Sequence, residues 1–166
     1  MIQKLVQLAL NEVGTREIGG NNNGPDIRKY QKATWLEPAA WSWCAAFTCW
    51  LLREWLKDPE VAKALSIKNP EAWRCKDASA FGWEKWAKVK ELQILPETAK
   101  AKAGDFVIFD FSHIGIVVKD QVGGTIQCVE GNTNGKGERD SESGDGVWLK
   151  TRARSLVKCY IRFPEV

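Results

Sequence analysis

The pattern of hydrophobic and polar residues divides the chain into a helical part and a part with strand periodicity, and the change comes at Pro96. Before it, apolar residues recur at intervals of three and four, the spacing of one helix face. Helices are predicted over residues 1–13 and 26–32, over about four turns from Cys44, and, interrupted at Pro59 and Pro70, from residue 58 to about residue 90. The stripe of the helix that begins at Cys44 comprises Cys44, Phe47, Thr48, Leu51 and Trp55.

After Pro96, hydrophobic and polar residues alternate, which is typical of strands with one buried face. Five strands are predicted, over residues 104–109, 113–118, 125–130, 147–152 and 157–163. Because the helices come first and the strands then follow one another, we expect an α+β fold, with N-terminal helices packed on an antiparallel sheet of about five strands. The pattern shows no internal repeat and no boundary, so residues 1–166 are expected to form one domain.

Composition narrows the function classes. The formal net charge is +3, and no stretch gathers lysine and arginine with interleaved aromatic residues, so nucleic acid is not an expected partner. No apolar run approaches the roughly 20 residues of a membrane span, and the first ten residues lack the features of an export signal. We therefore expect synthesis in the cytoplasm, no stable insertion into a membrane, and a monomer.

Cysteine and histidine usage points away from disulfides and metals. The five cysteines are odd in number and contain no C-x-x-C motif, which argues against a disulfide framework. One histidine and scattered thiols give a zinc site no support. Neither a metal nor an organic cofactor is expected.

Cys44 is the first candidate for chemistry, because it stands at or near the first turn of a predicted helix. The unpaired N–H groups and the positive end of the helix dipole stabilise an anion there, and the thiolate is the nucleophilic form of cysteine. Ala45 and Ala46, which follow, would let a substrate backbone come close. A cysteine among aromatic residues is also often a small buried hydrophobic residue. The helix alone leaves both interpretations open.

A thiolate nucleophile needs a base, and His113 is the only histidine of the chain. His113 begins one predicted strand, Glu130 ends the next, and each lies six residues from the connecting turn at 119–124. We expect antiparallel pairing to place them side by side on the face that the helices cover, where the carboxylate can accept the imidazole N–H. The alternative is an ordinary half-buried histidine beside a strand that simply ends in a turn.

Taken together, these segments resemble the CHAP family of cysteine peptidoglycan amidases and endopeptidases, which have a papain-like core. The resemblance lies in Trp-Cys-Ala-Ala-Phe at the helix start, Gly-Asp before a hydrophobic strand, His-Ile-Gly-Ile-Val-Val, and Val-Glu-Gly-Asn-Thr-Asn. It extends from the lead-in before Cys44 to the last strand, and so covers most of the chain. It implies Cys44 as nucleophile, His113 as general base and acid, Glu130 as the residue that orients the histidine, and Asn132 as a further member of the polar cluster.

The resemblance also implies oxyanion donors and substrate contacts. The Cys44 N–H would be one donor, but Trp43 stands where family members often have a polar residue, so the second donor is unassigned. The rings of Trp41 and Trp43, with Trp35 nearby and Tyr30 as a further candidate, could stack on sugars or stem peptides, or could pack in the core. Residues 56–80 exceed what a minimal CHAP domain needs, and we expect a helical insertion there.

The function implied is hydrolysis of an amide in bacterial peptidoglycan, either the muramoyl–L-alanine amide or a peptide bond of the stem or cross-link. A chain made without an export signal would suit a phage endolysin released through a holin. It would equally suit a toxin delivered to the periplasm or cell wall by a secretion apparatus and paired with an immunity protein. Two alternatives stay open, a cysteine hydrolase or transferase acting on a non-wall amide and a wall-binding module that has lost catalysis.

Overall fold

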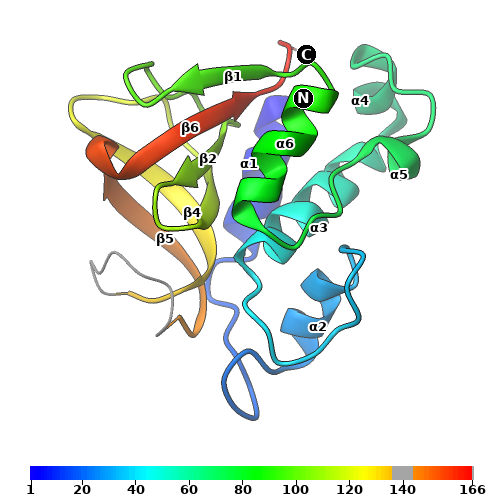
Figure 1. Cartoon of the computed structure of the whole chain (residues 1–166), viewed down its shortest axis with the longest axis vertical. Helices are drawn as coiled ribbons and strands as arrows, with labels where there is room; N and C mark the ends of the chain where they lie inside the picture. The colour runs from blue at the N-terminus through cyan, green and yellow to red at the C-terminus, as the bar shows by residue number, and fades with distance from the viewer. Residues whose placement is uncertain (136–143, 166) are drawn as a thin grey trace.

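In the part of the chain that the structure describes, six helices pack against a single antiparallel sheet of six strands (Figure 1). The structure is a computed structural model and describes residues 1–135 and 144–165. The helices are α1 (Ile2–Asn11), α2 (Pro25–Gln31), α3 (Cys44–Leu56), α4 (Pro59–Ala64), α5 (Pro70–Trp73) and α6 (Ala80–Val89). The strands are β1 (Gln93–Pro96), β2 (Phe106–Phe109), β3 (His113–Val117), β4 (Thr125–Thr133), β5 (Gly146–Ala153) and β6 (Val157–Arg162), with the 3-10 turn η1 (Arg154–Leu156) before β6.

The sheet has one strand more than the five predicted. Its order is β1-β6-β2-β3-β4-β5, and all five expected strands are present. The additional strand, β1, has only four residues and ends at Pro96, and its partner is β6 alone. A short edge strand that contains proline has little of the alternation that identifies strands in a sequence. The α+β fold with an antiparallel sheet is confirmed.

The prolines that interrupt the helical region start helices rather than only ending them. The first turn of α2 contains Pro25, that of α4 contains Pro59, and that of α5 contains Pro70. Proline lacks an N–H, but N–H groups in the first turn have no partner within the helix, so no hydrogen bond is lost there. Asp58 and Asn69 accept backbone N–H groups of the following turns. Residues 56–80, where a helical insertion is predicted, contain α4, α5 and the segment that leads to α6, and that they form an insertion stays a prediction.

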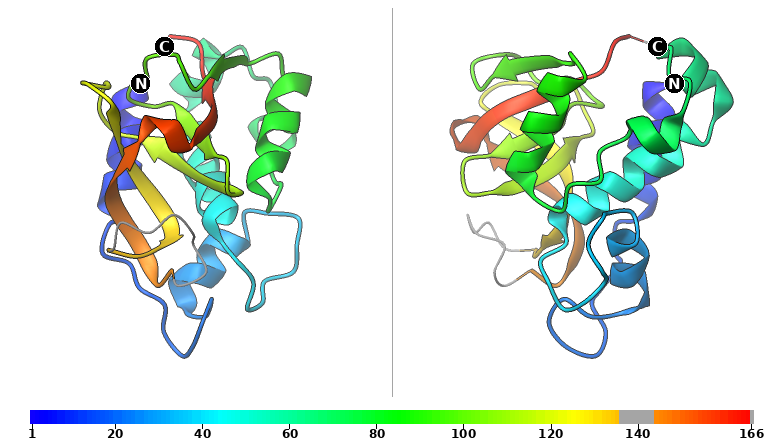
Figure 2. Two further views of the ribbon diagram at one scale, coloured as in Figure 1. Left: turned by 60° about the vertical axis from the view of Figure 1, so that its left-hand side comes forward. Right: turned by 45° about the vertical axis from the view of Figure 1, so that its right-hand side comes forward.

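Two hydrophobic clusters occupy the two faces of the sheet. Alternate residues of β2 divide between them, with Phe106 and Ile108 facing the helices and Val107 and Phe109 facing the smaller cluster. α3 lies at the centre of the larger cluster and contacts α1, β3 and β4, while α6 covers β1, β2 and β3. Figure 2 shows from two further directions that α2 lies at the N-terminal end of α3. In the part of the chain that the structure describes, no helix is long and apolar enough to cross a membrane.

Candidate active site

Cys44 is the first residue of α3, as the sequence predicts. The residue before it, Trp43, offers no side-chain acceptor to the first turn, so no side chain caps the N–H groups at the start of this helix. Cys44 keeps 7% of its surface exposed although its neighbours Ala45 and Ala46 are fully buried. A thiol and uncapped N–H donors therefore meet at one partly accessible point, which suits a nucleophile beside an oxyanion site.

His113 and Glu130 contact each other, with 2.7 Å between His113 Nε2 and Glu130 Oε1, and both side chains are fully buried. The contact confirms that the two residues meet, but not the expected register. β3 pairs with β4 as Ile116↔Val129 and Val117↔Cys128. Continued by one residue beyond Ile116, this register sets Gly115 opposite Glu130, so Glu130 lies diagonally from His113.

The register differs because the tight turn lies later than the midpoint of 119–124. Val122 bridges Thr125 around Gly123 and Gly124, which moves the centre of the connection toward β4. The diagonal contact depends on Gly115, since a Cβ there would lie 2.7 Å from Glu130 Cγ. Glycine at this position gives the Glu130 side chain room to pass across β3 and reach the imidazole.

The face on which this pair lies also differs from the prediction. Val117 and Cys128, which share a side of the sheet with His113 and Glu130, belong to the smaller cluster and not to the helix-covered core. The imidazole stacks on Phe109 and Phe111, with ring centroids 5.9 and 5.7 Å away. The prediction that the pair lies on the helix-covered face is therefore wrong.

Arg152 on β5 completes this buried group, and the sequence analysis missed it. Its guanidinium donates to both Glu130 oxygens, at 2.9 Å from Nε to Oε2 and 2.6 Å from Nη2 to Oε1. Its Cζ also lies 5.4 Å from the centroid of Phe109 and 5.5 Å from that of Phe111. In β5, the charged residues Lys150 and Arg152 are buried while Leu149 is half exposed, so the two cationic side chains of this strand face inward. This inversion of the usual pattern hid Arg152 from the sequence analysis.

The buried ionisable groups of this site shift one another's pKa values. Burial alone would lower the pKa of His113, but the Cys44 thiol and the hydrogen bond and charge of Glu130 outweigh it and raise that pKa from 6.5 to about 9. Burial would raise the pKa of Glu130, but hydrogen bonds from Arg152 and His113 lower it from 4.5 to about 2. At neutral pH the imidazole is therefore protonated, with the ionised Glu130 carboxylate at Nε2 and Cys44 near its other side.

The second ring nitrogen of His113 is the one available to Cys44. Nε2 is used by Glu130, while Nδ1 is buried and makes no hydrogen bond with the described residues. The Cys44 thiol is close enough to raise the pKa of the imidazole, although the two do not have hydrogen-bond geometry in this structure. Catalytic hydrogen bonds are often long in ligand-free structures and tighten when substrate binds.

The other predicted site residues fall into two groups. Asn132 is 2% exposed and has a left-handed backbone with φ of 54°, at an irregularity of β4 between Glu130 and Thr133. Trp43 and Tyr30 are fully buried and stack on each other with centroids 5.6 Å apart, so the core interpretation holds for these two rings. Trp41 is partly exposed and donates from Nε1 to the Glu37 carbonyl oxygen at 2.9 Å. It is the one ring of the three that a substrate could contact.

Comparison with known protein families agrees with this geometry. The sequence model of the CHAP domain matches residues 36–132, more than half of the chain. The chain belongs to the CHAP family. A search of curated proteins finds no significant match. The matched segment of the CHAP domain contains Cys44, His113, Glu130 and Asn132, whereas Tyr30 and Arg152 lie outside it. Membership in the CHAP family supports a function of the peptidoglycan-hydrolase type.

Proposed function

We propose that this CHAP protein is a thiol hydrolase that cleaves an amide of peptidoglycan, with Cys44 as nucleophile and His113 as general acid and base. One observation supports the proposal: buried side chains contact one another from Arg152 through Glu130 to His113, and Cys44 begins an uncapped helix beside them. A nucleophile, a base and a group that orients the base are the three parts of such a mechanism.

The proposed first step forms a thioester. The Cys44 thiolate, stabilised by the protonated His113, attacks the carbonyl carbon of the scissile amide. Negative charge develops on the carbonyl oxygen, and the uncapped N–H groups at the start of α3 are placed to stabilise it. When the C–N bond breaks, Nδ1–H of His113 gives its proton to the departing nitrogen. The acyl group stays on Cys44, and the amine leaves.

The second step returns the enzyme to its starting state. Nδ1 of the now neutral His113 takes a proton from water, and the hydroxide attacks the thioester carbonyl. The C–S bond breaks, the carboxylic acid product leaves, and Cys44 becomes a thiolate beside a protonated His113. Throughout, Glu130 accepts the Nε2–H of His113, and Arg152 keeps Glu130 ionised. Glu130 and Arg152 are positioning residues, because neither touches the reacting atoms.

The proposal is tested by digestion of purified peptidoglycan, with products identified by mass spectrometry. Fragments are expected from the natural protein and from Cys159→Ala, which removes a buried thiol of β6, but not from Cys44→Ala. Free stem peptides would identify a muramoyl–L-alanine amidase, and opened cross-links an endopeptidase. If no wall type is cleaved while soluble peptide amides are, the substrate is a non-wall amide and the wall-hydrolase proposal fails.

The proposed site of action is the periplasm or cell wall, reached through a holin or a secretion apparatus. Bacteria that make this protein fused to an export signal should lyse, whereas those that keep it in the cytoplasm should grow. Cys44→Ala is the control in both compartments. Lysis from the cytoplasm alone, or no difference between the two, would contradict this part of the proposal.

A further inference from the structure

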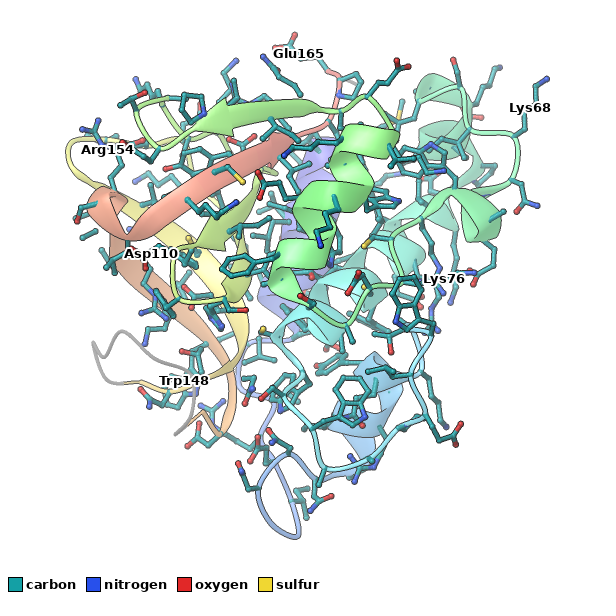
Figure 3. All side chains as sticks on the ribbon, viewed as in Figure 1. Lys68, Lys76, Asp110, Trp148, Arg154 and Glu165 are labelled. Carbon is teal, nitrogen blue, oxygen red and sulfur yellow. The ribbon has the colours of Figure 1, made fainter. Side chains whose placement is uncertain are left out.

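A pocket separate from the Cys44 site lies among the helices, and nothing in the mechanism uses it. It has a volume of about 430 Å³ and lies between α5 and α6, with Trp35 at its edge. This volume is in the range of pockets that bind small ligands. Figure 3 shows Lys76, which lines the pocket, on the helical side of the molecule, with Asp110 and Trp148 on the sheet side. We call this space the α5–α6 pocket.

The walls of the α5–α6 pocket are fixed before any ligand arrives. Arg74 donates to both carboxylate oxygens of Glu71 at 2.7 Å and to the carbonyl oxygen of Ala33 at 2.6 Å, which ties α5 to the loop before Trp35. The Trp35 N–H donates to the Lys76 carbonyl at 3.1 Å. A preformed wall lowers the ordering cost of binding.

Aromatic rings form the floor and one edge. Trp73 and Trp86 meet edge to face with centroids 5.2 Å apart, and Nε1 of Trp86 donates to the Trp73 carbonyl. Trp35 is 67% exposed, which is unusual for so large a ring and leaves one side of it open. Flat rings with an open side bind the C–H faces of sugars and apolar groups of peptides.

The charged lining residues are mostly basic, four against one: Arg74, Lys76, Lys85 and Lys90, against Asp77. Glu71 neutralises Arg74 and Lys76 in part. Lys85 and Lys90 form no ion pair within residues 1–135 and 144–165, and Asp77 is occupied as an acceptor for the Ser79 N–H. The net positive charge at the rim is complementary to an anionic ligand.

The α5–α6 pocket adjoins α3, the helix that begins at the nucleophile. The Cys49 thiol contacts the carbonyl oxygen of Asp77, a lining residue, at 3.4 Å. Cys49 is five residues along α3 from Cys44, about 7.5 Å of helix axis. In addition, Trp35 lies in the loop that leads directly to Cys44. One extended polymer could therefore reach both places.

We propose that the α5–α6 pocket is a second binding site for the peptidoglycan strand, which holds a muramyl ring against Trp35 and a stem-peptide carboxylate beside Lys85 and Lys90. This inference rests on the proposed wall-hydrolase function. It assigns α5 and the segment after it the task of binding the polymer at a distance from the scissile amide. Binding there would raise affinity for intact wall without altering chemistry on a short soluble substrate.

The test uses Cys44→Ala protein, which cannot turn over substrate, sedimented with purified insoluble peptidoglycan. In that background, Lys85→Gln with Lys90→Gln should weaken binding about tenfold, and Trp35→Ala about fivefold. The matched control is Lys102→Gln with Lys119→Gln, which removes the same charge from loops beside the sheet and should bind like the parent. With Cys44 intact, Lys85→Gln with Lys90→Gln should keep the natural rate on a short soluble amide.

The outcomes separate this inference from the proposed function. Equal binding by the pocket variants and the parent would overturn the second site while leaving hydrolysis by Cys44 untouched. Equal weakening by pocket and control variants would also overturn it, because the attraction would then follow net charge only. If muramyl dipeptide, the soluble probe, shifts the Trp35 indole NMR signal and competes with the wall, the site is supported. Failure of the natural protein to cleave any wall would instead refute the proposed function.

Discussion

The sharpest prediction concerns the proton on His113. Glu130→Gln removes the charge that raises the His113 pKa and leaves a side chain of nearly the same size, while Arg152 keeps its positive charge nearby. Burial and that cation both oppose a charged imidazole, and of the groups that raise its pKa only Cys44 remains, so the pKa of His113 should fall from about 9 toward 6.5. A fall from 9 to 6.5 corresponds to about 3 kcal/mol of lost preference for the protonated form.

The assay is an NMR titration of the imidazole. His113 is the only histidine in the chain, so one Cε1–H resonance reports its protonation without assignment ambiguity. Glu84→Gln, which removes a surface carboxylate paired with Lys158, is the matched control and should leave the titration unchanged. An imidazole that still titrates near pH 9 in folded Glu130→Gln would refute the argument that Glu130 holds the proton.

Stability has to be controlled in this experiment, because breaking a buried ion pair costs about 3–5 kcal/mol of the 5–15 kcal/mol typical of a domain. The double variant Glu130→Gln with Arg152→Met removes both charges and should restore much of that loss. Its His113 pKa should still lie far below 9, since the carboxylate is absent. If the pKa of His113 stayed near 9 in the double variant, the argument that Glu130 holds the proton would be refuted there too.

Three further predictions follow from the same group. Gly115→Ala should reduce activity and lower the free energy of unfolding in urea by about 1–3 kcal/mol, because the added Cβ would displace Glu130. At the control position Gly124 a Cβ meets nothing within 4 Å, so Gly124→Ala should change the free energy of unfolding by no more than about 0.5 kcal/mol. Iodoacetamide should alkylate Cys44 before Cys159, whose pKa is raised to about 11 by burial, as peptide mass spectrometry would show; equal rates would contradict the activation of Cys44. Because the folded pKa of His113 is raised to about 9 from 6.5, its stabilising contribution is complete below pH 6.5 and is lost toward pH 9, so urea midpoints should fall over that range. A flat profile would contradict this sign.

Local signals were enough to predict most of the elements. The start of α3 at Cys44 follows from a 3.6-residue stripe, whereas Pro59 and Pro70, predicted as interruptions, turned out to begin α4 and α5. β1 was missed because a four-residue edge strand has no long-range signal in its own sequence. The contact of His113 with Glu130 was predicted from symmetry about a turn, but its register depended on where the chain actually reverses, at Gly123 and Gly124.

The pattern of the sequence could not identify Arg152 as a site residue, because the burial of its guanidinium depends on the carboxylate of Glu130 on the neighbouring strand. A carboxylate such as Glu130 is rarely fully buried without a positive partner, and this requirement is visible only once Glu130 is known to be at 0% exposure. With Glu130 placed, the inward-facing positions of the paired strand β5 become the place to look for the cation. Arg152 is at one of them, six residues past Gly146, the first residue of β5.

Trp43 and Tyr30, which were candidates for contacts with sugar, instead hold the start of α3 in place. Trp43 immediately precedes the nucleophile, stacks on Tyr30, and donates from Nε1 to Glu17 at 3.0 Å. Tyr30 in turn meets Phe47 of α3 edge to face. These contacts fix the first turn of α3 against α2, so the direction of the Cys44 thiol is set by buried rings and not by a capping side chain. A helix start that is held by packing can leave its N–H groups free for an oxyanion, which a capped helix could not do.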